Sequence, residues 1–195
     1  MTSPDTAAPA VSREGARKTL HLATSAVPLA SAVGLSTNWL RWGLLAALGV
    51  ALGVELARRQ SSTLARAFSR WTVGMLRPSE VGGALTGATW MLVGYLGAVL
   101  LGPRDAAIAA MWAVAAGDGV ATLVGRRWGT PGAKSAAGSL AMLLVTFAGG
   151  WGVAGLAPSW ALGVALAATV AERWPTFAND NVRIPAVVLL MLSIR

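Results

Sequence analysis

Residues 117–139, GDGVATLVGRRWGTPGAKSAAGS, determine how we interpret the rest of the chain. They begin inside an apolar segment, residues 106–124, whose single carboxylate is Asp118, between Gly117 and Gly119. An acid in such a segment costs free energy in a bilayer and is by default a hypothesis for a functional site. Glycines on both sides let another backbone or a ligand come close. The stretch therefore predicts a membrane helix that carries a buried functional acid.

The loop that follows is basic and rich in glycine. Lys134 and Ser135 precede Gly138 and Ser139 at the expected start of the next helix. Cations, hydroxyls and free N–H groups at a helix N-terminus suit phosphate, although the spacing is not that of a P-loop. We expect Asp118 to hold a divalent cation and the loop to hold the phosphates of a nucleotide. An interhelical hydrogen bond of Asp118 is the alternative.

The composition is that of an integral membrane protein. Of 195 residues 55% are hydrophobic and 12% are charged, whereas a soluble domain carries about 25% charged residues. The absence of cysteine excludes disulfides and thiolate metal sites, and one histidine excludes a histidine-rich site. The net charge of +8 is explained by membrane topology and anionic lipid rather than by nucleic acid.

Apolar segments predict an all-α bundle of six or seven transmembrane helices. Residues 1–14 are expected to be a disordered cytoplasmic tail without a signal peptide, and residues 15–195 a single membrane domain. The last two segments are shorter than the roughly 20 residues that a spanning helix needs. The predicted segments are 20–35, 40–57, 81–102, 106–124, 140–156, 160–171 and 184–194.

Charge predicts the orientation of the bundle. With the N-terminus in the cytoplasm, all lysines and arginines except Arg41, Arg104 and Arg195 lie on the cytoplasmic side. We expect a multi-pass protein of a bacterial inner or plasma membrane, with its site facing the cytoplasm, where nucleotides and magnesium are available. The other polar residues expected at this face are His21, Glu55, Glu80, Asp118, Glu172, Asp180 and Asn181.

Several of these residues have structural alternatives. Arg17 and His21 share a helix face and, with Lys18, form either a phosphate grip or snorkelling charges at the interface; the residues alone favour snorkelling. Glu55 precedes an arginine by three residues, which favours an ion pair at the helix end. Glu80 suits the first turn of a helix.

The C-terminal cluster is also open to two interpretations. Asp180 can be a helix N-cap, and Pro185 suits a helix start. Alternatively Asp180 or Glu172 joins Asp118 in holding magnesium against a triphosphate, since hard cations prefer oxygen ligands.

Taken in order, these motifs resemble the polyprenol kinase family. That family includes dolichol kinase, phytol kinase and the CTP-dependent diacylglycerol kinase, and is distantly related to phosphatidate cytidylyltransferases. One departure is Ala137, where the family often has glutamate. The matching pieces are Arg17-Lys18-x-x-His21, Glu55-x-x-Arg58, Glu80 before Leu85-Thr86-Gly87-Ala88-Thr89, Gly117-Asp118 with Ala121, Gly125 and Arg126, Lys134-Ser135-x-x-Gly138-Ser139, Thr169-x-x-Glu172-x-x-Pro175, and Asp180-Asn181-x-x-Ile184-Pro185.

The resemblance implies a lipid kinase. It implies magnesium-dependent transfer of the γ-phosphoryl group of CTP to the hydroxyl of a prenol-type lipid, such as phytol or dolichol, or of diacylglycerol. The metal would be held by Asp118 with Asp180 or Glu172, and the general base is open among Asp118, Glu172 and His21. The cations expected at phosphates are Arg17, Lys18, Arg126 and Lys134. The other nucleotide contacts expected are Gly117, Gly119, Gly125, Ser135, Gly138, Ser139 and Asn181.

Two other functions fit parts of the pattern. A phosphatidate cytidylyltransferase would use the same nucleotide but release pyrophosphate. A small transporter would carry intramembrane acids too, but would place polar residues at mid-membrane depth and on both faces. The crowding of polar residues on one face favours the enzyme. Neither the lipid alcohol nor the oligomeric state follows from the sequence.

Overall fold

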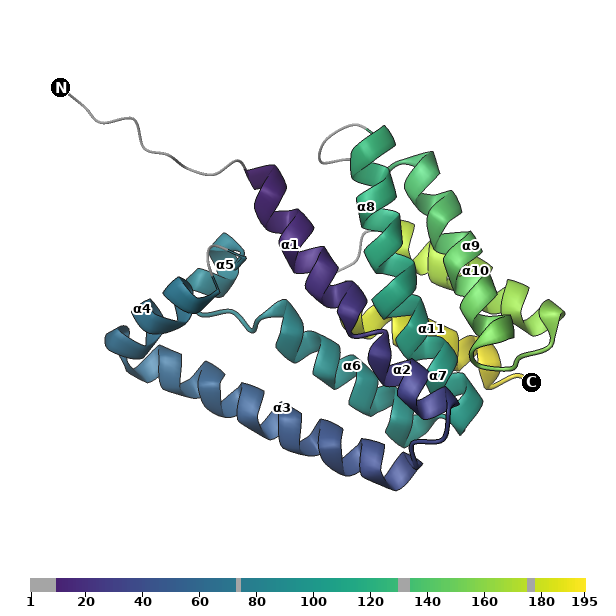
Figure 1. The fold of residues 1–195 in the computed structure, drawn as a ribbon, viewed down its shortest axis with the longest axis horizontal. Helices are drawn as coiled ribbons and strands as arrows, with labels where there is room; N and C mark the ends of the chain where they lie inside the picture. Colours follow the sequence, from purple (N-terminus) through teal and green to yellow (C-terminus); the bar gives the residue numbers. More distant parts are fainter. Residues whose placement is uncertain (1–9, 73–74, 130–133, 175–177) are drawn as a thin grey trace.

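The computed structural model describes residues 10–72, 75–129, 134–174 and 178–195, and within them every regular element is a helix (Figure 1). The predicted all-α class is confirmed. Most of each predicted apolar segment is helical, but residues 82–86 of the segment 81–102 and residues 153–156 of the segment 140–156 are not. The elements are α1 (Ala10–Ala23), α2 (Ala26–Ala32), α3 (Thr37–Gln60), α4 (Ser62–Trp71), α5 (Pro78–Val81), α6 (Gly87–Leu101), α7 (Arg104–Trp112), η1 (Ala113–Asp118), α8 (Gly119–Trp128), α9 (Ala136–Gly152), α10 (Pro158–Arg173) and α11 (Asp180–Leu192).

Two helices of the described chain are long and apolar enough to cross a membrane, judged by length and composition alone. They are α3 and the continuous helix Arg104–Trp128, which α7, η1 and α8 form together. The apolar surface of α3 is mostly exposed, whereas Arg104–Trp128 is mostly buried. α6 and α9 are apolar but shorter. A bundle of six or seven spans remains a prediction.

The N-terminal segment differs from the sequence prediction. Helix α1 begins at Ala10, so residues 10–14 are helical, although residues 1–14 were expected to be disordered; residues 1–9 lie outside the described part. The first apolar segment is divided by a turn at residues 24–25 into α1 and α2.

The core surrounds the continuous helix Arg104–Trp128. Its η1 part packs against α1, α9, α10 and α11, and α6 packs between α3 and α11. Figure 1 shows α3 along one edge of the molecule, with α4 turning back from its end. The largest fully buried side chains include Met111, Val114, Met142, Val164 and Ile184. These helices therefore hold one apolar interior that fixes the ends of α1, α8, α10 and α11 relative to one another.

Helix α11 begins differently from the prediction. Its N-cap is Asn179, whose side chain accepts a hydrogen bond of 3.0 Å from the Asn181 amide, and Asp180 is the first helical residue. The prediction that Asp180 is the N-cap is wrong by one residue. Pro185 lies inside the helix rather than at its start. Proline cannot donate to the carbonyl four residues earlier, which is that of Asn181.

The Asn181 carbonyl packs against α6 at a glycine. A Cβ built on Gly94 would lie 1.9 Å from the Asn181 oxygen, which no side chain permits. This contact lets α11 cross α6 closely enough to bring Asn181 toward the polar end of the bundle.

Candidate functional site

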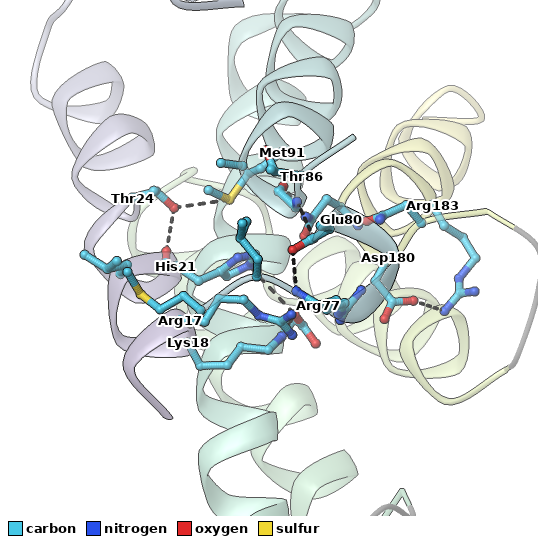
Figure 2. A pocket seen from close by; sticks show the side chains of 18 of the residues that line it. Arg17, Lys18, His21, Thr24, Arg77, Glu80, Thr86, Met91, Asp180 and Arg183 are labelled. Carbon is cyan, nitrogen blue, oxygen red and sulfur yellow. Dashed lines mark hydrogen bonds and ion pairs between the residues drawn. The ribbon is translucent and has the colours of Figure 1, made fainter. Parts of the chain in front are cut away.

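A cavity of about 770 Å³ opens between α1, α4, the α5–α6 turn, the end of α10 and the start of α11. Figure 2 shows Arg17, Lys18 and His21 on α1 facing Arg77 and Glu80, with Asp180 and Arg183 on a third side. Segments far apart in the sequence therefore contribute polar groups to one space. The predicted site residues that line it are Arg17, Lys18, His21, Asp118, Lys134, Glu172, Asp180 and Asn181.

Asp118 is the most deeply buried acid of the cavity, with 2% of its surface exposed. Its Oδ2 atom forms an ion pair with Lys18, and the Nε2 atom of His21 lies 3.7 Å from the same oxygen. The His21 Nε2 atom also lies 2.8 Å from the Val114 carbonyl oxygen. The Lys18 and His21 side chains are 12% and 10% exposed. The favoured alternative, snorkelling at the interface, is therefore wrong for both residues.

A π-helical segment, η1, places Asp118 at the cavity. Such segments occur often at functional sites because the wider turn changes the direction of the side chains that follow. No sequence pattern that we used predicts it. Its presence explains how a residue in the middle of a long buried helix reaches the cavity wall.

The glycines beside Asp118 serve helix packing. A Cβ on Gly117 would lie 2.5 Å from Thr146 Oγ1 on α9, and one on Gly119 would lie 2.9 Å from Leu22 on α1. Neither glycine lines the cavity. The two glycines therefore allow α1 and α9 to pack close to Asp118, whereas the resemblance implied that they contact a nucleotide.

A second ion pair joins Glu172 and Lys134. Glu172 lies at the end of α10 and is 5% exposed, while the Lys134 side chain is 48% exposed. Lys134 also acts electrostatically on Asp118, so the two pairs are neighbours. Next to Glu172, Arg173 lines the cavity and donates a hydrogen bond of 2.9 Å to Ser139 Oγ.

The start of α11 completes the polar wall. Asp180 forms an ion pair with Arg183 within the helix. Asn181 Nδ2 donates a hydrogen bond of 2.7 Å to the Gly87 carbonyl at the start of α6. Pro175 of the predicted C-terminal motif lies outside the described residues.

Among the described residues of the predicted phosphate-binding loop, Lys134 lines the cavity. Ser135 caps α9 by accepting a hydrogen bond of 3.0 Å from the Gly138 amide. A Cβ on Gly138 would lie 2.8 Å from the Ala121 carbonyl oxygen, and one on Gly125 would lie 3.1 Å from Ser135 Oγ. These contacts pack α8 against α9. Residues 130–133 lie outside the described part, and the predicted residues that do not line the cavity are Gly125, Arg126, Ser135, Gly138 and Ser139.

The sequence analysis missed the apolar wall of the cavity. It is formed by Leu20, Phe68, Met75, Leu76 and Met91. The periodic spacing of apolar residues along α4 could have identified Phe68 as a residue of this wall. We found no such sequence pattern for the other four residues. One cavity is therefore lined by both charged and apolar side chains, which we call its charged wall and its apolar wall.

A group of buried polar residues, which we call the scaffold cluster, joins α3 to the α5–α6 turn, and two of its members, Glu80 and Thr86, also line the cavity. The cluster consists of Glu55, Arg58, Glu80, Thr86 and Thr89. Glu55 Oε1 accepts hydrogen bonds from the Thr86 amide (2.8 Å) and Thr89 Oγ1 (3.2 Å), and Oε2 accepts one from Arg58 Nε (2.6 Å). The ion pair predicted between Glu55 and Arg58 is confirmed.

The same cluster fixes the turn that lines the cavity. Arg58 donates hydrogen bonds of 2.5 Å to the Glu80 and Ala84 carbonyl oxygens. The Glu80 carboxylate accepts from the Arg77 amide (2.8 Å) and the Gly87 amide (2.9 Å), and it lies in the first turn of α5 as predicted. Every carboxylate oxygen of the cluster thus has a donor from the chain itself.

No group of three or more histidine or acidic side chains in the described residues is arranged to hold a metal ion. Magnesium, however, is commonly held by one or two carboxylates together with substrate phosphates. Asp118 and Glu172 are buried acids at the cavity, so their chemistry fits that mode of binding. Asp180 is more exposed and bonded within its own helix.

In comparisons with known proteins, no family model, no curated protein and no solved structure matches this chain.

Proposed function

We propose that this protein is a membrane kinase that transfers the γ-phosphoryl group of CTP to the hydroxyl of a lipid alcohol, either a prenol-type lipid or diacylglycerol, at the cytoplasmic face. The observation that carries the proposal is that one cavity is lined by charged side chains and by apolar side chains. A phosphorylated nucleotide and a lipid alcohol require those two chemistries side by side.

The charged wall suits a triphosphate. Lys18 and Lys134 each form an ion pair with a buried acid. An ammonium group has three N–H donors, of which such a pair needs one, so both lysines retain donors for phosphate oxygens. Arg17, on the same helix as Lys18, adds a third cation at the wall. Charge-assisted hydrogen bonds of this kind are the stronger ones in proteins.

In this proposal, magnesium binds together with the nucleotide. Asp118 and Glu172 are the acids that would bind the ion, and phosphate oxygens would supply its other ligands. When bound, magnesium neutralises part of the charge on the phosphates.

The remaining groups orient the acceptor. Phe68, Met75 and Met91 line the apolar wall, where a lipid tail can lie while its hydroxyl reaches the charged wall. His21 lies close to Asp118 and, if its Nε2–H donates to the Val114 carbonyl, leaves Nδ1 to accept a proton. Positioning and electrostatics account for most of the catalysis of phosphoryl transfer, so Asp118, Glu172 and His21 all remain candidates for the base.

The test is transfer of label to lipid. The purified protein in detergent is given γ-labelled CTP or ATP, magnesium and a panel of phytol, polyprenol and diacylglycerol. The proposal expects labelled lipid with the wild type, more with CTP than with ATP, and a loss of label in Asp118→Asn. Asp105→Asn is the matched control, because Asp105 also forms an ion pair, with Arg195 at 2.6 Å, but lies outside the cavity.

Other results would replace the proposal. Pyrophosphate release with a lipid phosphate, and no labelled lipid with any alcohol, would indicate a cytidylyltransferase. No turnover of either nucleotide would reject an enzyme of this kind and make transport the next function to test.

A further inference from the structure

Helix α4 is amphipathic and has no buried residue. Leu64, Phe68 and Trp71 recur at intervals of four and three residues and so share one face. Leu64 is 50% and Trp71 87% exposed. Arg66 and Arg70 lie on the opposite face, where Arg66 donates a hydrogen bond of 3.3 Å to Thr63 Oγ1. A helix with a strong polar face and exposed large apolar side chains suits the interface of a bilayer.

The charged residues along the chain at α4 are all positive. No aspartate or glutamate occurs over residues 56–79. The guanidinium of Arg58 belongs to the scaffold cluster, but Arg59, Arg66 and Arg70 are exposed. Exposed arginines without neighbouring acids along the chain match an anionic surface, and basic residues beside a membrane segment are attracted to anionic lipid headgroups.

The position of α4 is set by a candidate span. Only Ser61 separates it from α3, one of the two helices that are long and apolar enough to cross a membrane. Ser61 adopts an extended conformation, so α4 turns away from the axis of α3 instead of prolonging it (Figure 1). If α3 crosses the bilayer, α4 begins where the bilayer ends.

The apolar face of α4 also reaches the cavity. Phe68 lines the apolar wall, and the guanidinium of Arg58 lies 5.5 Å from the centre of its ring. Thr72, just after the helix, lines the cavity as well. One face of α4 therefore borders the cavity at Phe68 and is exposed at Leu64 and Trp71, so the cavity lies beside the surface on which the exposed residues would rest.

We propose that α4 lies on the bilayer surface and binds anionic phospholipid headgroups through Arg59, Arg66 and Arg70, and that this contact holds Phe68 in the cavity wall. The inference rests on the membrane location in the proposed function but not on the kinase reaction. Anionic phospholipid is then a structural partner of the site and distinct from its substrate.

The absence of cysteine makes the test direct, because one introduced cysteine can be spin-labelled without altering any other residue. Ala67→Cys places a label beside the apolar face of α4, and Ser69→Cys places one on the polar face. Each protein is incorporated into bilayers of phosphatidylcholine alone or mixed with phosphatidylglycerol. Collision of the label with oxygen, which is concentrated in lipid, and with a water-soluble nickel chelate reports its depth.

In bilayers with phosphatidylglycerol we expect the label at position 67 to collide with oxygen and the label at position 69 to collide with nickel. Without the anionic lipid, the label at 67 should gain access to nickel. Adding Arg66→Gln and Arg70→Gln should weaken the response to phosphatidylglycerol by about fivefold for each arginine removed. Arg127→Gln, an exposed arginine at the end of α8, is the matched control and should leave the response unchanged.

Three results would overturn the inference. Equal access of nickel to both positions in anionic bilayers would place α4 in water. Exclusion of both probes from position 67 would mean that a second copy of the chain covers this face. A chain that does not associate with bilayers would reject both this inference and the proposed function, whereas failure of the kinase assay alone would leave the depth measurement standing.

Discussion

The scaffold cluster and the charged wall of the cavity are both made of buried acids beside cations, but their hydrogen bonding differs. In the scaffold cluster, Arg58 binds Glu55 and two backbone carbonyls, and Glu55 accepts from three donors. At the cavity, Lys18 forms an ion pair with Asp118, which also lies 3.7 Å from His21 Nε2, and Lys134 forms an ion pair with Glu172. The first group is saturated by the protein, and the second retains hydrogen-bonding capacity toward the cavity.

This difference separates stability from function. A buried, fully bonded ion pair is costly to break because removal of one partner leaves the other charge without compensation. A pair at a cavity wall reaches water, so its loss affects the fold less and the ligand more. We therefore expect variants of the scaffold cluster to lower the free energy of unfolding, and variants of the charged wall to lower binding and transfer.

The largest effect is expected from Arg58→Met. It leaves the Glu55 carboxylate buried without its cation, which costs about 3–5 kcal/mol in the free energy of unfolding. Thermal unfolding in detergent, followed by tryptophan fluorescence, measures it. Arg59→Met is the matched control, since the adjacent arginine is exposed and should change stability little. Equal losses in the two variants would remove the distinction between the regions.

Asp118→Asn should lower the transfer rate on the order of 10²–10³-fold, because a preorganised charge at the reacting centre is removed. Its loss of stability should be smaller than that of Arg58→Met, since Lys18 lines the cavity and can turn to water there. The rate of label transfer and the unfolding temperature are measured on the same preparation. An unchanged rate would exclude Asp118 from the site.

Gly94→Ala tests the close crossing of α6 and α11, which connects the scaffold cluster to the start of α11 at the cavity. The added methyl would collide with the Asn181 carbonyl and push α11 from α6, at a cost of about 1–3 kcal/mol in the free energy of unfolding. Gly97→Ala on the same helix meets no atom within 4 Å and should be neutral or slightly stabilising. If the two variants unfold alike, the close crossing of α6 and α11 is not present in the protein.

The smallest effect on stability is expected from Lys134→Gln. Its side chain is 48% exposed, so water screens the pair although Glu172 is buried, and we expect a loss of about 1 kcal/mol in the free energy of unfolding. The KM for the nucleotide should nevertheless rise about tenfold through loss of a charge-assisted hydrogen bond. Lys134→Arg keeps the charge and should recover part of the affinity. A change in unfolding temperature without a change in KM would assign Lys134 to the scaffold.

The sequence predicted the helices and the polar end of the fold because both depend on simple patterns. Runs of apolar residues mark the helices, and the placement of basic residues marks one end of them. The predicted acids and cations from α1, η1, α10 and α11 line one cavity. The placement of basic residues sufficed for this because it assigned the polar residues of several segments to the same side of the membrane.

Other features depend on contacts that no local pattern encodes. Gly117, Gly119 and Gly138 pack against side chains or carbonyls of other helices, so their use follows from the tertiary arrangement rather than from glycine-rich composition. The π-helical segment η1, which ends at Asp118, lies where the central helix packs against α1, α9, α10 and α11, and we found no local pattern that marks it. The ion pair of Lys18 with Asp118 joins residues a hundred positions apart, which the spacing of residues along one helix cannot predict.

The most direct test of the account is equilibrium binding of labelled CTP, with magnesium, to the purified protein, because it needs no acceptor lipid. Wild type, Asp118→Asn and Glu55→Gln are compared at a temperature at which all three are folded. The account predicts similar affinity for the wild type and Glu55→Gln, and binding at least about tenfold weaker for Asp118→Asn. Binding by Asp118→Asn that equals the wild type, or no binding by the wild type, would contradict it.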